Sequence, residues 1–142
     1  MRGLVRLAIG LWLGGLSLIT ATRAEEWTDE LTLWTGAVAH SPQRPLPWIN
    51  LGQQYQYRGQ PEKAALAFRM ASRAAQAPAR DRDEQIVGRA IADTNLALLA
   101  INRGDRAEGL RQLLLITTRS PELRTPQRLV KWVCAESPLP GC

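Results

Sequence analysis

The spacing of apolar and small residues between positions 48 and 78 constrains the fold more than any other feature of the chain. The first group repeats with the period of a helix, about 3.6 residues: Trp48, Leu51, Gly52 and Tyr55. The second group has the same period: Ala64, Phe68 and Ala71. Between them, Gly59 suits a left-handed position after a helix, and Pro61 suits the first turn of the next helix. The pattern predicts an antiparallel helical hairpin in which small residues of one helix receive large side chains of the other.

Together with Gly59, these residues fall in register with one tetratricopeptide repeat, a helix–turn–helix unit of about 34 residues. The chain resembles this family most clearly over residues 48–78. The resemblance implies an all-α fold, with about six helices in a short solenoid after an N-terminal apolar helix. It also implies a surface that binds other proteins.

A degenerate copy of the pattern follows around Gly104, the next turn glycine. We expect one unit at residues 45–78 and a second at 90–121, with a longer connection and a helix extension between them. Residues 25–42 and 125–133 are expected to form flanking helices, because the end repeats of a solenoid need caps. The predicted domains are a leader or anchor at residues 1–24, a helical domain at 25–134 and a tail at 135–142.

The N-terminus combines positive charge with an apolar run. Arg2 and Arg6 precede 15 uncharged residues at positions 7–21, a length typical of a signal peptide and short for a membrane span. A start at Gly3 gives a marginal span of about 20 residues. A cleaved signal peptide and a retained anchor, which contacts the membrane through residues 3–22, therefore both remain open. Since positive charge stays in the cytoplasm, both place the repeats in a bacterial periplasm, free or held at the inner membrane.

The basic composition does not predict a nucleic-acid partner. The formal net charge is +5, but Arg2, Arg6 and Arg23 lie in the first 24 residues, and without them it falls to +2. The remaining arginines alternate with acidic residues along the chain. The chain has no basic block and no alternation of aromatic and basic residues of the kind that single-strand binders use.

The two cysteines, Cys134 and Cys142, flank a segment with two prolines and a glycine. In an oxidising compartment the pair would form a disulfide that ties the tail to the last helix. Two free thiols, and metal or redox chemistry, are the alternatives. Metal binding is disfavoured because the sequence offers no further ligands nearby and His40 is the sole histidine. We expect neither a metal nor another cofactor.

No catalytic constellation is recognisable in the sequence. A Ser-His-Asp or Cys-His arrangement would have to use His40, which has no nucleophile motif around it. The acidic residues Asp81, Asp83 and Glu84 lie near a predicted helix start, where acids complement the helix dipole. We therefore expect no enzymatic activity.

In solenoids of this family the first helix of each pair lines a concave groove, so the resemblance implies where a protein partner binds. The positions there that packing does not require are Asn50, Gln53, Tyr57, Thr94, Asn95, Leu98 and Asn102. Asn50 and Asn95 are equivalent, and their amides could bind a peptide backbone; the alternative is that these residues are simply exposed. Tyr57 is the strongest single candidate, because tyrosine is favoured at interfaces. Repeats that grip a C-terminal carboxylate carry Lys and Asn where this chain has Ile49 and Gln53, so that mode is not expected.

Residues 7–78 also resemble the junction in membrane glycosyltransferase-like proteins where the last membrane helix runs into a first repeat. The sugar-transfer site lies outside this resemblance. We therefore expect a non-catalytic interaction module, an accessory or assembly subunit of an envelope complex. The alternatives are a structural subunit that packs through its anchor and its solenoid ends, where Trp132 is a candidate contact, and a part of an envelope glycosylation system.

Overall fold

The computed structural model describes residues 12, 29–78, 82–136 and 139–142. In these ranges the chain contains only α-helices, which confirms the expected all-α class. The helices are α2 (Glu30–His40), α3 (Pro45–Tyr57), α4 (Pro61–Ala74), α5 (Arg82–Asn102), α6 (Arg106–Arg119) and α7 (Arg124–Glu136). The predicted leader or anchor lies outside the described residues, apart from Trp12. None of the helices that are described has the length and apolar character needed to cross a membrane.

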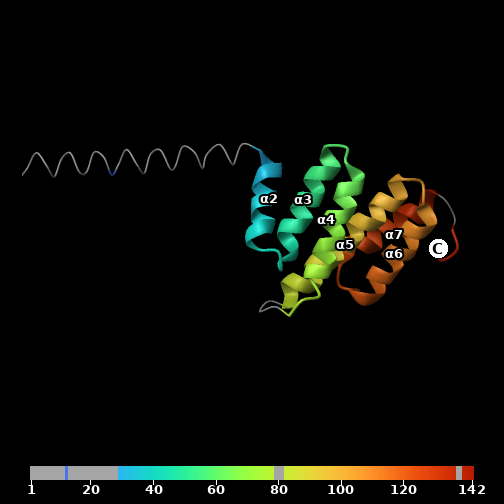
Figure 1. Cartoon of the computed structure of the whole chain (residues 1–142). Helices are drawn as coiled ribbons and strands as arrows, with labels where there is room; N and C mark the ends of the chain where they lie inside the picture. The colour runs from blue at the N-terminus through green and yellow to red at the C-terminus, as the bar shows by residue number, and fades with distance from the viewer. Residues whose placement is uncertain (1–11, 13–28, 79–81, 137–138) are drawn as a thin grey trace, which may run out of the picture. The chain divides into compact units, whose positions relative to one another are not determined.

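Helices α3 to α7 form a stack within the compact unit Trp34–Cys142. Each of them packs against the next along the chain, and α3 also contacts α5 (Figure 1). Short turns reverse the chain between α3 and α4 and between α5 and α6. Two helical hairpins therefore lie against each other, with α7 packed on the second, as the sequence predicts.

Glycines end the first helix of each hairpin in the left-handed conformation. Gly59 has φ +68° and Gly104 has φ +93°. The amide of Gln60 donates to the carbonyl of Tyr55 at 2.9 Å, and the same bond recurs at the end of α5. This is the Schellman arrangement, which satisfies carbonyls that the helix end leaves open.

The first hairpin is held by close approach between α3 and the ring of Phe68 on α4. Phe68 and Ala64 are both fully buried. A Cβ atom at Gly52 would lie 2.5 Å from Cε1 of Phe68, well inside contact distance. Gly52 is therefore required because the ring packs directly on the backbone of α3, which is the reason the sequence suggests for a glycine within a helix.

The second hairpin repeats this device without an aromatic residue. Gly109 on α6 lies so close to α5 that a Cβ atom there would be 2.8 Å from the carbonyl oxygen of Ala97. Leu110, Leu113 and Val133 are among its fully buried side chains and join α6 to α7. Backbone contact and aliphatic packing thus replace the tryptophan, tyrosine and phenylalanine of the first hairpin.

The two turn glycines, Gly59 and Gly104, lie 45 residues apart in the sequence because α5 is long, with 21 residues. Its extra N-terminal turns reach back to the start of α3, where Gly88 packs against the ring of Pro45. Arg44 and Glu84 form a hydrogen-bonded ion pair of 2.9 Å beside this contact. The predicted helix extension is therefore confirmed, and it ties the two hairpins together.

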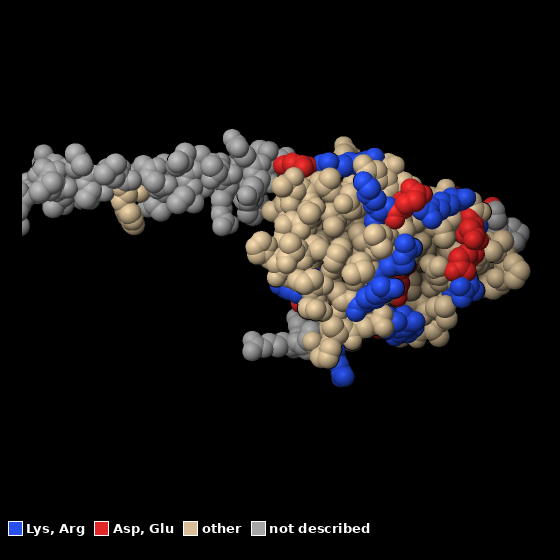
Figure 2. Space-filling model, viewed as in Figure 1, with Lys and Arg blue, Asp and Glu red and all other residues tan. Residues whose placement is uncertain are grey.

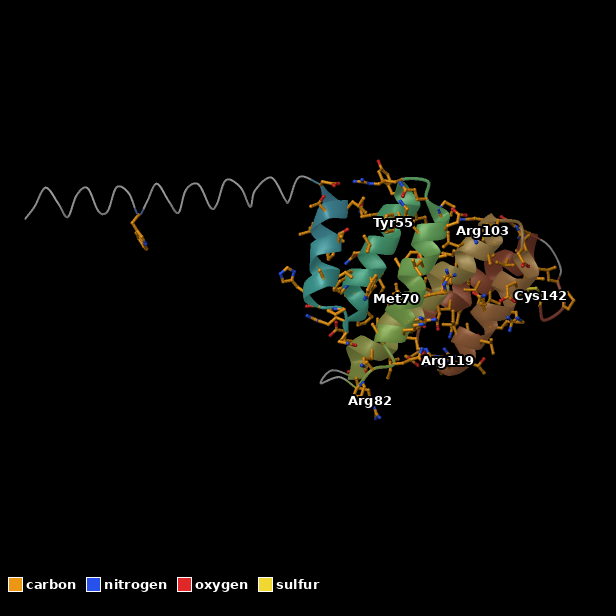
Figure 3. The ribbon with its side chains drawn as sticks, viewed as in Figure 1. Tyr55, Met70, Arg82, Arg103, Arg119 and Cys142 are labelled. Atoms are coloured by element: carbon orange, nitrogen blue, oxygen red, sulfur yellow. A yellow bond between two sulfur atoms is a disulfide. The ribbon has the colours of Figure 1, made fainter. Side chains whose placement is uncertain are left out.

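The C-terminal tail is fastened to α7. The sulfur atoms of Cys134 and Cys142 lie 2.04 Å apart, as in a disulfide. The tail carries Leu139 against the aliphatic core of the second hairpin. Figure 3 shows Cys142 at the α6 and α7 end of the unit.

Replacing Gly52 with alanine tests the close approach of α3 and α4. Alanine gains about 1 kcal/mol over glycine in a helix interior, but overpacking a rigid core costs about 1–3 kcal/mol. We expect the free energy of unfolding, measured with urea, to fall by about 1 kcal/mol. The control is Gly36→Ala in α2, where a Cβ atom meets nothing within 4 Å and the helix gain should appear alone. Equal shifts in the two variants would contradict this packing.

Reduction of the disulfide should weaken the fold. The bond closes a loop with a sequence separation of 8 residues, and a loop of this size removes unfolded-state entropy worth about 2–3 kcal/mol. We expect dithiothreitol to lower the free energy of unfolding by about that amount, whereas a Cys134→Ser variant should not respond to it. A wild-type protein that shows free thiols before reduction, or no change after it, would refute this expectation.

Candidate binding groove

A groove of about 430 Å³ runs between α5 and α7. We call it the α5/α7 groove. Most of its lining is aliphatic, with the following side chains from α5, α7 and the turn before α7: Val87, Ala90, Ile91, Leu98, Leu123, Pro126 and Leu129. The polar lining residues are Thr94, Asn95, Arg124 and Thr125. The structure thus brings three of the predicted groove residues, Thr94, Asn95 and Leu98, into one depression.

The apolar stripe on α5 follows from its sequence. Val87, Ile91 and Leu98 recur at intervals that keep them on one face of the helix. Core packing leaves much of this stripe open, since Val87 is 42% exposed and Ile91 39% exposed. Two large aliphatic side chains thus lie partly exposed on one shared face, and contiguous exposed apolar patches can mark interaction sites.

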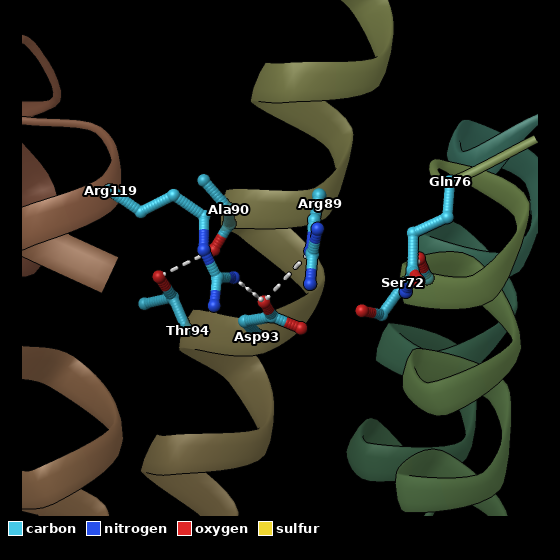
Figure 4. A network of polar contacts seen from close by, with 7 residues as sticks. All are labelled: Ser72, Gln76, Arg89, Ala90, Asp93, Thr94 and Arg119. Atoms are coloured by element: carbon cyan, nitrogen blue, oxygen red, sulfur yellow. Dashed lines mark hydrogen bonds and ion pairs between the residues drawn. The ribbon is translucent and has the colours of Figure 1, made fainter. Parts of the chain in front are cut away.

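The polar groups on α5 are partly used by the helix itself. The hydroxyl of Thr94 donates to the carbonyl of Ala90 at 2.6 Å, as Figure 4 shows. The Nδ2 amide of Asn95 donates to the carbonyl of Ile91 at 3.0 Å. A ligand would therefore find the side-chain carbonyl of Asn95 as an acceptor, while its amide donor is already bonded to the backbone.

Arg124 is the single charged residue among those that line the α5/α7 groove. It begins α7 and is exposed. Within the described part of the chain, no ion pair or hydrogen bond joins it to another residue. The groove therefore has positive charge at the start of α7 and no acidic lining residue to balance it.

The other predicted groove residues do not line this depression. Asn50 on α3 is half-buried and Gln53 is exposed. Tyr57 is 89% exposed at the last residue of α3, and Asn102 is exposed at the last residue of α5. Ile49, which stands where repeats that bind a C-terminal carboxylate carry a lysine, is buried in the core. Contact of these residues with a partner remains a prediction.

The α7 wall of the groove escaped the sequence reasoning. Leu123, Arg124, Thr125, Pro126 and Leu129 line it, whereas the sequence predicts a capping helix at residues 125–133 with Trp132 as its candidate contact. The available signal is the strong amphipathic pattern of this helix, whose apolar residues recur on one face. That pattern predicts burial, but it does not say that α5 lies near enough to leave a groove.

Trp132 lies outside the groove and is 43% exposed. The guanidinium of Arg106 on α6 sits 5.8 Å from the centroid of its ring. Arg106 also forms an ion pair of 3.0 Å with Glu136. The exposed indole is therefore partly covered by a cation–π contact within the protein.

Of the residues weighed for catalysis, Asp81 lies outside the described residues, and His40 lies at the end of a helix. His40 ends α2, and its Nδ1 lies 2.8 Å from the carbonyl of Gly36. Among the residues that the structure describes, no group of three or more His, Cys, Asp or Glu side chains could hold a metal ion. No protein-family model, curated protein or solved structure matches this chain.

Proposed function

We propose that this protein is a non-catalytic binding module of the tetratricopeptide type, which holds a segment of a partner protein in the α5/α7 groove. The observation that carries the proposal is the apolar stripe of α5, which stays open to solvent opposite α7. Burying a Val or Ile side chain completely is worth about 1.5–3 kcal/mol, so covering Val87 and Ile91 would add part of that free energy to binding. Grooves between helices are a recurrent means of binding amphipathic peptide segments.

The chemistry of the groove defines its occupant. Aliphatic walls call for an apolar face on the bound segment. Arg124 favours a carboxylate at the start of α7, because it is the only charged residue, and no acid is found, among the described residues that line the groove. The occupant we propose is therefore a short amphipathic protein segment with an acidic residue next to its apolar face.

An envelope setting is consistent with two features of the chain. Arg2, Arg6 and the apolar residues that follow resemble an export signal or anchor. The Cys134–Cys142 pair suits an oxidising compartment such as the periplasm. We infer an accessory or assembly subunit of a periplasmic or inner-membrane complex.

A second candidate is a structural subunit that packs through its ends and leaves the groove empty. The observation in its favour is Trp132, a large aromatic residue that is 43% exposed at the last helix. In that case Trp132→Ala should abolish assembly with the partner, while substitutions in the groove should not.

Selection from a random library of peptides of about 12 residues on the immobilised protein tests the groove. We expect enriched peptides to combine spaced apolar residues with Asp or Glu. Their Kd, measured by fluorescence anisotropy, should rise about tenfold, or about 1.4 kcal/mol, in an Ile91→Asp variant. The same selection on an Arg124→Glu variant should yield peptides that lack the acidic residue.

The matched control is Leu66→Asp, which introduces the same charge at an exposed leucine of α4. This variant should bind the selected peptides as the wild type does. Equal losses of affinity in Ile91→Asp and Leu66→Asp, or an unchanged affinity in both variants, would show that the groove is not the binding site. Thermal melting establishes that both variants are folded.

A further inference from the structure

A second depression follows α5 on the side that faces α4 and α6. It consists of three adjoining hollows of about 400, 200 and 240 Å³. The first two share Asp93, Ile116 and Arg119, and the last two share Leu96 and Gln112. The three hollows therefore adjoin one another along α5, and we call them together the arginine furrow.

The furrow collects basic residues that are far apart in the sequence. Its arginines come from α4, α5, the turn after α5 and α6: Arg69, Arg82, Arg89, Arg103 and Arg119. Its acidic lining residues are Asp93 and Glu122. Figure 2 shows Lys and Arg side chains following one another across this face, and Figure 3 labels Arg103 and Arg119 on it. The lining thus has an excess of positive charge.

Internal ion pairs do not use up this charge. Arg89 and Arg119 both approach the same oxygen of Asp93, at 3.7 and 3.2 Å, so one carboxylate serves two guanidinium groups (Figure 4). The Nε atom of Arg89 is buried and has no hydrogen-bond partner among the described residues. Arg103 pairs with Glu62, whose side chain is 80% exposed. Exposed ion pairs of that kind contribute little free energy, so the arginine can exchange this partner for a carboxylate of a ligand.

The side chain of Arg69 has no ion pair or hydrogen bond with any residue in the described ranges. Its guanidinium offers a planar fork that matches a carboxylate. Because the side chain of Arg69 is unpaired and Asp93 is shared by two other arginines, guanidinium donors remain available along the length of the furrow.

The walls and floor of the furrow favour a peptide over a nucleic acid. Its lining includes the aliphatic residues Leu96, Leu99 and Ile116, and none of the residues that line it is aromatic. Single-stranded nucleic acids are usually held by stacking of bases on aromatic side chains. An extended peptide instead needs apolar contacts for some side chains and charge partners for others.

We propose that the arginine furrow binds an acidic, extended protein segment, whose carboxylates pair with the arginines and whose apolar side chains cover the aliphatic floor. This site is separate from the α5/α7 groove, since Ala90 is the only residue that lines both. The protein would therefore contact its partners on two faces.

The test uses the full chain and fluorescein-labelled peptides of about 12 residues in which Glu and Leu are interspersed. A matched peptide with Gln in place of Glu is the neutral probe. We expect the acidic peptide to bind at low salt at least tenfold more tightly than the neutral one, and to weaken as salt is raised. The double variant Arg69→Glu with Arg119→Glu should lose at least tenfold in affinity.

A control variant, Arg128→Glu with Lys131→Glu, changes the net charge by the same amount on α7, at exposed residues that line neither the furrow nor the groove. It should retain binding within about twofold of wild type. An equal loss in this control would attribute binding of the acidic peptide to net charge alone, and would overturn the proposal. Tighter binding of oligothymidine or heparin than of the acidic peptide would also overturn it, in favour of a polyanion site.

Two further variants keep the outcome interpretable. Arg69→Gln removes a side chain that has no internal partner, so it tests the furrow even if the double variant is unstable; it should weaken the acidic peptide about threefold or more, and unchanged affinity would count against the site. Ile91→Asp disrupts the groove, and it should leave unchanged the preference of the furrow for the acidic peptide over the neutral one. Failure of the groove and failure of the furrow are thereby distinguished.

Discussion

The contact between the ring of Phe68 and the backbone of α3 at Gly52 determines how the rest of the structure is arranged. Because no side chain stands between them, α3 and α4 approach closely and bury the ring completely. The same ring belongs to a cluster that includes Leu99 of α5. The buried cluster around this ring thus includes α5, the helix on which both candidate sites depend.

Helix α5 is the central element of the unit because it supplies a different face to each site. Val87, Ile91 and Leu98 line the α5/α7 groove, whereas Asp93 and Leu96 line the arginine furrow. Its extra N-terminal turns, held at Gly88 and by the Arg44–Glu84 pair, lengthen both depressions. A surface built on one long, well-packed helix costs little ordering when a ligand binds, which favours recognition of flexible segments.

The two depressions differ in chemistry in a way that suits different ligands. The α5/α7 groove is mainly aliphatic with a single charge, Arg124. The furrow gathers five arginines around an aliphatic floor. A module that combines apolar and electrostatic contacts can gain specificity from both, because charge orients a partner and burial supplies much of the affinity. Our proposal of a binding function rests on this combination and not on any resemblance of the whole chain.

The sequence by itself determined the helices and turns of the described unit. Periodic apolar residues, Pro61 at a helix start and Gly59 and Gly104 at helix ends act within a few residues, so their effects can be read without a fold. The small residue Gly52 even indicated close approach, although not that Phe68 would be the partner. Along the chain, however, arginines alternate with acids, and this alternation concealed the furrow.

Only the tertiary structure decided which side chains meet. Arg69, Arg89 and Arg119 lie on three helices, and packing places them along one furrow, which the described acids Glu84, Asp105 and Glu108 do not line. The groove likewise needed the position of α7 relative to α5, which local periodicity cannot supply. The physical reason is that helix formation depends on neighbouring residues, whereas a binding surface depends on distances between helices that are set by buried contacts far apart in the sequence.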